Sequence, residues 1–386
     1  MKALAMLLVL FALGCLAVPA WAEPVEDIGV YLWQTPRVRD IDATQTAGLI
    51  DELAGEIDRV LEAGPLAPLR ASYADIPIEA YYVYAERGRI ITTLAWAWPH
   101  LPADRQPRVK DYVRDLLAER THAPWTAGLL TVDDGAVRGL HGQRIREGRF
   151  LGVSGDGANA PTLHVLYGLW LYGDRTGDWG AIRPYWDEIK QWYGRSGSPP
   201  PLYGQMGAHI GLARLARRFG DSAAEEMAVA GLSRDLEEGQ DLAAIARRLE
   251  HTRFAHFSSD RNRSHFPGDC WIFLDAPPEI LRFLADGADR RQDALQRAEA
   301  MKSRYPLWWL HQAPYFTRWT GDEGVGAPPE LMGMIYPVER WVRKAPADEL
   351  AGYMRSTPVG IGDCYWLESL AQTIEAFGTV TWEPLE

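Results

Sequence analysis

The sequence predicts an all-α protein built from alternating outer and inner helices, and three observations support that fold class. Apolar residues recur at helical spacing along most of the 386-residue chain. A Gly followed directly by Asp separates successive helical runs, as at Gly173 and Asp174 and again at Gly220 and Asp221. Gly accepts the left-handed conformation that ends a helix, and Asp is a good N-cap for the next one. Proline also begins several of the more apolar runs, where it marks a helix start.

The first helix of each expected pair is charged and has a single apolar stripe. In residues 45–61, for example, Leu49, Leu53 and Ile57 share one face. Such a helix lies at the surface with its stripe turned inward. Six outer helices are therefore expected, at residues 45–61, 108–119, 181–192, 223–249, 291–304 and 346–355.

The second helix of each pair carries less charge and more aromatic residues. A helix that is apolar nearly all round must be buried, so these are the expected inner helices. Pro77, Pro161, Pro277 and Pro328 each stand at or near the first position of one of them. The six inner helices are expected at residues 77–98, 161–172, 203–219, 277–286, 328–342 and 363–377.

Residues 1–22 are expected to be a cleavable signal peptide rather than part of the fold. Lys2 precedes an apolar run, and a small-x-small pattern ends at Ala22. The protein is therefore expected to be secreted or periplasmic. A lipid anchor at Cys15 is the weaker alternative, because Ala12 stands where that motif usually has a large aliphatic residue.

One domain is expected over residues 23–386, because no Pro/Gly/Ser-rich linker divides them. The chain carries 52 acidic and 40 basic residues, a net charge of −12 at pH 7, which disfavours nucleic acid as a partner. No segment after the leader is apolar over the length of a membrane span. Zinc, phosphate-loop and dinucleotide motifs are lacking, so neither a metal nor a cofactor is expected.

Cys270 and Cys364 share the same Gly-Asp-Cys-aromatic setting. In an oxidising compartment they form a disulfide if they meet in the fold, and otherwise they pack as two buried thiols. The sequence leaves both alternatives open.

The order of the helices resembles a known architecture. Beyond the six pairs, the resemblance is carried by residues 155–172, by the run 175–178, and by Trp186 and Ile189. The pattern is similar to the (α/α)6 toroids of the six-hairpin glycosidase superfamily and of the related toroidal polysaccharide lyases. This resemblance implies an all-α (α/α)6 toroid of six outer/inner helical hairpins. It also implies that the N-terminal ends of the inner helices converge on one mouth, which holds the active site.

Three aspartates are expected at that mouth, on loops that lead to three different inner helices: Asp156, Asp269 and Asp363. Glycoside hydrolysis needs one carboxylic acid to protonate the leaving oxygen and one carboxylate to activate water or to attack carbon. We take Asp156 as the acid, and Asp269 or Asp363 as the base. Asp363 has a second interpretation as the plain N-cap of its helix.

Substrate-binding side chains are expected around the same mouth. Aromatic rings suit the apolar faces of pyranose sugars, and polar side chains suit their hydroxyl groups. The candidates are Asn159, Tyr203, Gln205, His209, His265, Trp271, Trp319, Glu330 and Trp366. Helix capping is the preferred interpretation of three other carboxylates, Asp75, Asp275 and Glu279, and it competes with binding for Glu330.

Two alternatives to a glycoside hydrolase remain open. A uronate polysaccharide lyase needs a Tyr or His base and a clamp on the substrate carboxylate. The residues available for that chemistry are Asn159, His164, Tyr203, His209, Arg261, Arg263 and His265. The negative charge of the chain argues mildly against such a polyanionic substrate. The other alternative is a non-catalytic toroid that binds a glycan or a protein partner in the cell envelope.

Overall fold

A computed structural model describes residues 28–64, 87–118, 165–195, 203–238, 273–310, 329–358 and 361–385. Within these ranges the chain is mostly helical and has almost no strand, which confirms the predicted all-α class. Each of the twelve expected helices has at least part of its length among the described residues.

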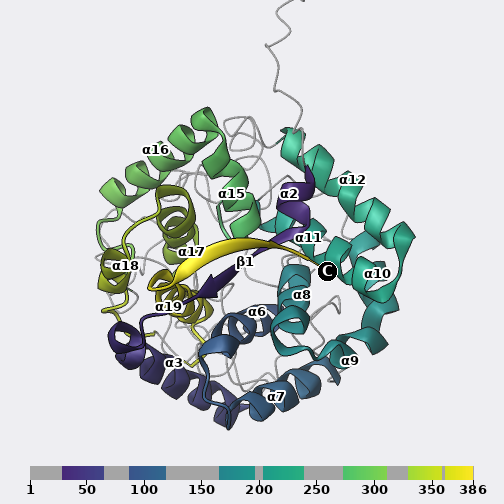
Figure 1. Cartoon of the computed structure of the whole chain (residues 1–386), viewed down its shortest axis with the longest axis horizontal. Coiled ribbons are helices and arrows are strands. Elements are labelled where there is room, and N and C mark those ends of the chain that lie inside the picture. The colour runs from purple at the N-terminus through teal and green to yellow at the C-terminus, as the bar shows by residue number, and fades with distance from the viewer. Residues whose placement is uncertain are drawn as a thin grey trace, which may run out of the picture.

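The outer helices lie around the rim of the molecule in Figure 1. Their apolar stripes face inward, as the charge pattern predicts: Leu53, Ile57 and Val60 of the first one are fully buried. These helices are α3 (Ala43–Ala63), α7 (Gln106–Ala118), α9 (Trp179–Ile182), α10 (Trp186–Arg195), α12 (Ser222–Glu238), α16 (Ala288–Arg304) and α18 (Ala347–Tyr353).

The inner helices lie closer to the middle of the same view (Figure 1). They are α6 (Arg87–Ala97), α8 (Val165–Thr176), α11 (Tyr203–Phe219), α15 (Pro278–Asp286), α17 (Pro329–Pro337) and α19 (Cys364–Ala376). Burial all round confirms their inner position. In α8 every residue from Val165 to Gly173 is buried, and in α19 every residue from Cys364 to Glu375 is buried.

Three helices differ locally from the expectation. The inner helix α8 continues through Gly173 and Asp174 to Thr176, so this Gly-Asp pair does not separate two helices. The outer helix expected at 181–192 is interrupted by a 3-10 turn at Arg183–Tyr185, because Pro184 lacks an amide N–H and its ring clashes with a preceding carbonyl. The inner helix α17 ends at Pro337 and continues as the π-helical segment η6 (Val338–Arg343).

A two-stranded antiparallel ribbon is the element that the sequence analysis did not predict. Strand β1 (Gln34–Arg39) pairs with β2 (Thr379–Pro384), and Gln34 lies opposite Pro384. The short helix α2 (Ile28–Leu32) precedes β1. Figure 1 shows the ribbon crossing the middle of the molecule over the inner helices. The ribbon therefore joins the two ends of the described chain.

Cys364, the first residue of α19, is a buried free thiol. Burial raises its pKa to about 12, so the thiol stays protonated at neutral pH. This position fits the packing interpretation of the cysteine rather than the disulfide. Cys270 lies outside the described residues.

Replacing Gly211 by Ala is expected to destabilise the fold strongly. An added Cβ there would overlap the backbone of Leu166 and Tyr167, because α11 and α8 pack backbone against backbone at this point. Overpacking against backbone that cannot move costs about 3 kcal/mol or more of unfolding free energy, measured by urea titration. Gly55→Ala in α3 is the matched control, since nothing lies within 4 Å of its added Cβ. It should stabilise the protein by up to about 1 kcal/mol, and equal effects of both changes would contradict the close packing of α8 and α11.

Candidate functional site

A cluster of charged side chains lies where the N-terminal ends of three inner helices meet. Arg89 comes from the first turn of α6, Asp275 from the loop that enters α15, and Glu368 from the second turn of α19. The Arg89 guanidinium donates hydrogen bonds to Glu368 Oε2 at 2.8 Å and to Asp275 Oδ1. It also lies 3.7 Å from the centre of the Tyr365 ring. Thr93 Oγ1 donates to the second oxygen of Glu368 at 2.8 Å. We call these residues the Arg89 cluster.

The Arg89 cluster is buried. The side chain of Arg89 is 5% exposed, and those of Asp275 and Glu368 are each 10% exposed. Burial by itself would lower the pKa of Arg89, but the two carboxylates outweigh it and raise that pKa well above the usual range.

Asp275 does not have the role that the sequence analysis preferred. It was expected to cap α15, but the N-cap of that helix is Pro277, and no side chain bonds to the helix start. Asp275 instead adopts φ of 61°, in the left-handed region that is uncommon for residues other than Gly. In this backbone conformation, Asp275 accepts a hydrogen bond from Arg89, which lies 186 residues away in the chain.

Glu279 was also expected to act as a cap, and that interpretation was wrong too. Its carboxylate is fully buried and accepts hydrogen bonds from Arg214 Nη1 at 2.8 Å and from Tyr167 Oη at 3.1 Å. The pKa of Tyr167 is raised well above its usual range, first by burial and then by Glu279. Glu279 therefore connects α15 with α8 and α11 inside the inner layer.

Asp363 occupies the N-cap of α19. Its Oδ1 accepts a hydrogen bond from the backbone N–H of Trp366 at 3.2 Å, and the residue is fully buried. The capping interpretation of Asp363 is therefore confirmed. Its role as a catalytic base stays a prediction that this geometry does not favour.

Trp366 belongs to the core rather than to a sugar-binding platform. It is fully buried, and its Nε1 donates to the carbonyl oxygen of Ser356 at 2.8 Å. An indole with no exposed face cannot stack on a sugar in this conformation. The expectation that Trp366 binds substrate is corrected accordingly.

His209 lies between α11 and the outer helices, away from the Arg89 cluster. Its Nδ1 is 2.6 Å from Tyr193 Oη of α10, and its Nε2 is 2.9 Å from Asp235 Oδ2 of α12. Both ring nitrogens are thus engaged in contacts that connect an inner helix with two outer ones. This position corrects the expectation that His209 binds substrate.

The remaining candidates are described in part or not at all. Tyr203, Gln205 and Glu330 lie in the first turns of α11 and α17, at the N-terminal ends of inner helices as expected, although only their backbone is described. The candidates that lie outside the described residues are Asp156, Asn159, His265, Asp269, Trp271 and Trp319.

Arg89 was missed by the sequence analysis, although the sequence contains a signal for it. It directly precedes the apolar run that begins at Ile90 and Ile91, within an expected inner helix. A buried arginine requires a paired carboxylate, so its position predicts an acidic partner from another element. The residues next to Arg89 in the sequence do not show which carboxylate is that partner.

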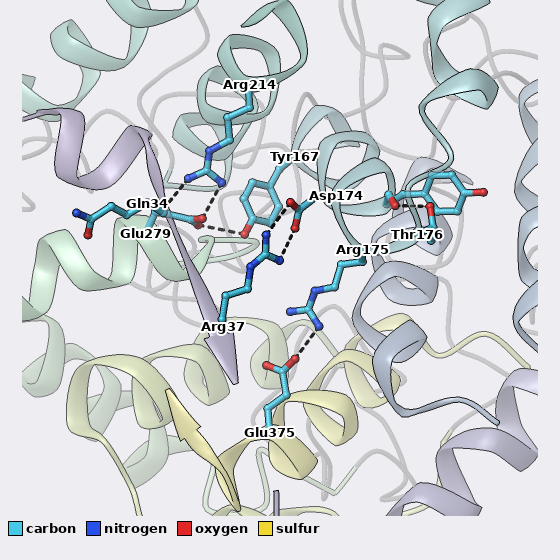
Figure 2. Close-up of polar contacts among 10 residues, drawn as sticks. Gln34, Arg37, Tyr167, Asp174, Arg175, Thr176, Arg214, Glu279 and Glu375 are labelled. Atoms are coloured by element: carbon cyan, nitrogen blue, oxygen red, sulfur yellow. Dashed lines mark hydrogen bonds and ion pairs between the residues drawn. The ribbon is translucent and has the colours of Figure 1, made fainter. Parts of the chain in front are cut away.

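A second set of ion pairs lies toward the C-terminal ends of the inner helices, beneath the ribbon. Figure 2 shows Arg37 of β1 with Asp174 of α8, and Arg175 of α8 with Glu375 of α19. Arg37 is bidentate, with nitrogen–oxygen distances of 2.6 and 2.8 Å. The first pair joins β1 to α8, and the second joins α8 to α19.

Glu375 is expected to make the unfolding free energy sensitive to acid. Burial alone would raise its pKa, but Arg175 and His100 outweigh burial and lower the pKa from 4.5 to about 2. A lowered pKa in the folded state stabilises the protein above pH 4.5, and this contribution is lost as the pH falls toward 2. Urea unfolding between pH 7 and pH 2.5 should therefore show a steeper loss of stability in the wild type than in Glu375→Gln. Parallel profiles would show that another group controls the acid response.

The described residues contain neither a helix with the length and apolar character of a membrane span nor a group of three or more residues suited to hold a metal ion. What the fold and the site define is a mostly helical protein with a buried arginine–carboxylate cluster at the N-terminal ends of its inner helices.

No protein-family model matches this chain, and comparisons with curated proteins and with solved structures also give no match. A proposal about its function must therefore be based on its own residues.

Proposed function

We propose that this chain is an (α/α)6 toroid of six outer/inner hairpins and that it acts as a secreted or periplasmic glycoside hydrolase. The alternation of rim and inner helices in Figure 1 supports the toroid. The observation that carries the enzymatic proposal is the Arg89 cluster, in which Asp275 from the loop before α15 and Glu368 from α19 come together. Hydrolysis of a glycosidic bond requires one carboxyl group as acid and another as base or nucleophile, and this cluster supplies a candidate for the base.

Arg89 determines whether Asp275 and Glu368 can act as the acid or as the base of the reaction. A neighbouring guanidinium favours the ionised form of a carboxyl group. An ionised carboxylate can activate water or attack carbon, but it cannot donate the proton that the leaving oxygen needs. We assign Asp275 as the water-activating base, with Arg89 and Glu368 as its positioning residues. Asp269 is the alternative base.

The acid must then come from a residue away from Arg89. Asp156 keeps the role that its position between two glycines suggests, on a loop that can approach a ligand closely. An acid in a site of low polarity stays protonated at neutral pH and can donate to the leaving group.

A uronate lyase is less well supported than a hydrolase. His209, one of its candidate bases, has both ring nitrogens occupied by Tyr193 and Asp235.

The proposed reaction is tested by incubating the purified protein with a panel of oligosaccharides and polysaccharides. New reducing ends without absorbance from unsaturated uronate would support hydrolysis. Absorbance from unsaturated uronate would replace the hydrolase with a lyase. Binding to a glycan of the panel without either product would replace both with a non-catalytic toroid.

Asp156→Asn is expected to lower turnover on the active glycan by about 100-fold or more, because it removes the proton donor. Asp269→Asn should have a comparable effect only if Asp269, rather than Asp275, is the base. Initial rates of both variants are compared with the wild type, and circular dichroism checks that the helical content is unchanged. A wild-type rate in Asp156→Asn would remove this residue from the mechanism.

A further inference from the structure

Two basic side chains face one carboxylate at the end of α19 that is remote from the Arg89 cluster. Arg175 Nη1 donates to Glu375 Oε1 at 2.8 Å, as Figure 2 shows, and His100 Nε2 lies 3.7 Å from the same oxygen. A third basic side chain, Arg340 of η6, is near enough for the charge of Glu375 to raise its pKa. Glu375 lies seven positions after Glu368 in α19, which corresponds to about 10 Å along the helix. The two clusters are therefore distinct.

Several N–H groups of these basic residues are buried and have no acceptor. They are Nε of Arg175 and Nε and Nη2 of Arg340, and the ring nitrogen Nε2 of His100, 3.7 Å from Glu375, also has no hydrogen-bond partner. The side chains of Arg175 and His100 are 9% and 4% exposed. A buried donor that loses water without gaining an acceptor costs about 1–3 kcal/mol, and more when it is charged.

The neighbouring acceptors are already in use. Asp174 accepts both hydrogen bonds from Arg37. The side-chain oxygen of Gln372 accepts from Trp341 Nε1 at 2.9 Å, and Thr373 Oγ1 is 2.6 Å from Tyr336 Oη. Among the described residues, Glu375 is thus the one carboxylate that the three basic side chains share.

Of the three basic side chains, Arg340 is the one whose charge is least compensated by neighbouring negative groups. Burial lowers its pKa below the usual range, since neither Tyr336 nor Glu375 offsets the loss of hydration. Its guanidinium lies 5.0 Å from the centre of the Trp341 ring, a contact that supplies no hydrogen-bond acceptor for Nε or Nη2. Two arginines against one carboxylate leave one positive charge.

We propose that a small inorganic anion, a tetrahedral oxyanion or a halide, binds among Arg175, Arg340 and His100. One negative charge balances the excess positive charge, and the oxygens of an oxyanion or the surface of a halide accept hydrogen bonds from the unpaired N–H groups. The anion is a structural ligand that joins α8, η6 and the 3-10 segment η2 (Trp98–His100). The site does not depend on the proposed hydrolase activity.

The test is the thermal unfolding of the full chain in sodium chloride, sulfate or phosphate, at an ionic strength held constant with a bulky sulfonate salt. The wild-type Tm should rise by about 3 °C and then saturate as the bound anion increases. The anion that saturates at the lowest concentration identifies the class: sulfate and phosphate together indicate an oxyanion site, whereas chloride indicates a halide site.

Arg340→Met should abolish the saturable rise. Arg343→Met is the matched control, since Arg343 lies in the same π-helical segment but is paired with Glu339 and Glu349, and it should keep the rise. His100→Gln provides a second variant if Arg340→Met does not fold, and it should weaken the response at least tenfold in anion concentration. A wild-type Tm that does not saturate, or the same response in Arg340→Met, would overturn the proposal and leave water as the partner of these N–H groups.

Discussion

Asp275→Asn is expected to lower turnover on the active glycan by about 10³-fold, because the amide cannot accept the proton of the attacking water. The amide still bonds to Arg89, so the fold should be retained. Initial rates across pH 4 to 8 give the measurement.

The exposed Asp289 near the start of α16 provides the control for Asp275. Asp289→Asn makes the same chemical change and should keep the wild-type rate and pH profile. Added formate or azide supplies a small base to the site of a shortened side chain, so Asp275→Gly should regain activity with either anion. A purely structural role would give no such rescue. An Asp275→Asn variant with more than a tenth of the wild-type rate would transfer the role of base to Asp269.

Glu279→Gln is expected to lower the unfolding free energy by about 3–5 kcal/mol, the largest effect on stability among the changes considered. Arg214 and Glu279 are 1% and 0% exposed, so the change leaves a buried guanidinium without its counter-charge. Arg214 also donates to the backbone oxygens of Leu32 and Gln34, each at 2.8 Å. Loosening Arg214 should therefore increase hydrogen exchange in β1 as well.

Glu56→Gln is the control for Glu279, because Glu56 pairs with the half-exposed Arg59 at 2.7 Å on the surface of α3. Surface pairs of this kind contribute less than about 1 kcal/mol. Urea unfolding compares the two variants with the wild type. Similar losses in both would mean that the buried pair stabilises the fold no more than a surface pair does.

The helices were predictable because their signals are local. A helical apolar period, a proline at the start and a glycine at the end all lie within one turn or a few turns of each other. Thus α11 was expected at 203–219 and is observed at Tyr203–Phe219. The strands carry no such signal, since each is short and finds its partner at the other end of the chain. Sequence patterns within a window cannot report a pairing of that kind.

The candidate site was predictable only in its position. The sequence placed functional carboxylates near the N-terminal ends of the inner helices, and the Arg89 cluster lies there. It assigned Asp275 to capping, because an acidic residue before a helix usually is a cap. The contact that overrides this rule comes from Arg89 on α6, a helix that packs against α19, and such a contact between distant segments has no local signal in the sequence.

The ribbon has a consequence for the order in which this chain assembles. Strand β2 follows every described helix, so β1 emerges first during synthesis and remains without a strand partner until residues 379–384 have been made. Helix pairs form from neighbouring segments, whereas the ribbon closes a loop of more than 300 residues, a contact that is slow to form. A chain truncated before Thr379 would keep an unpaired strand edge exposed, a surface open to pairing with other chains. The pairing of β1 with β2 is therefore expected late in folding, and it requires residues 379–384.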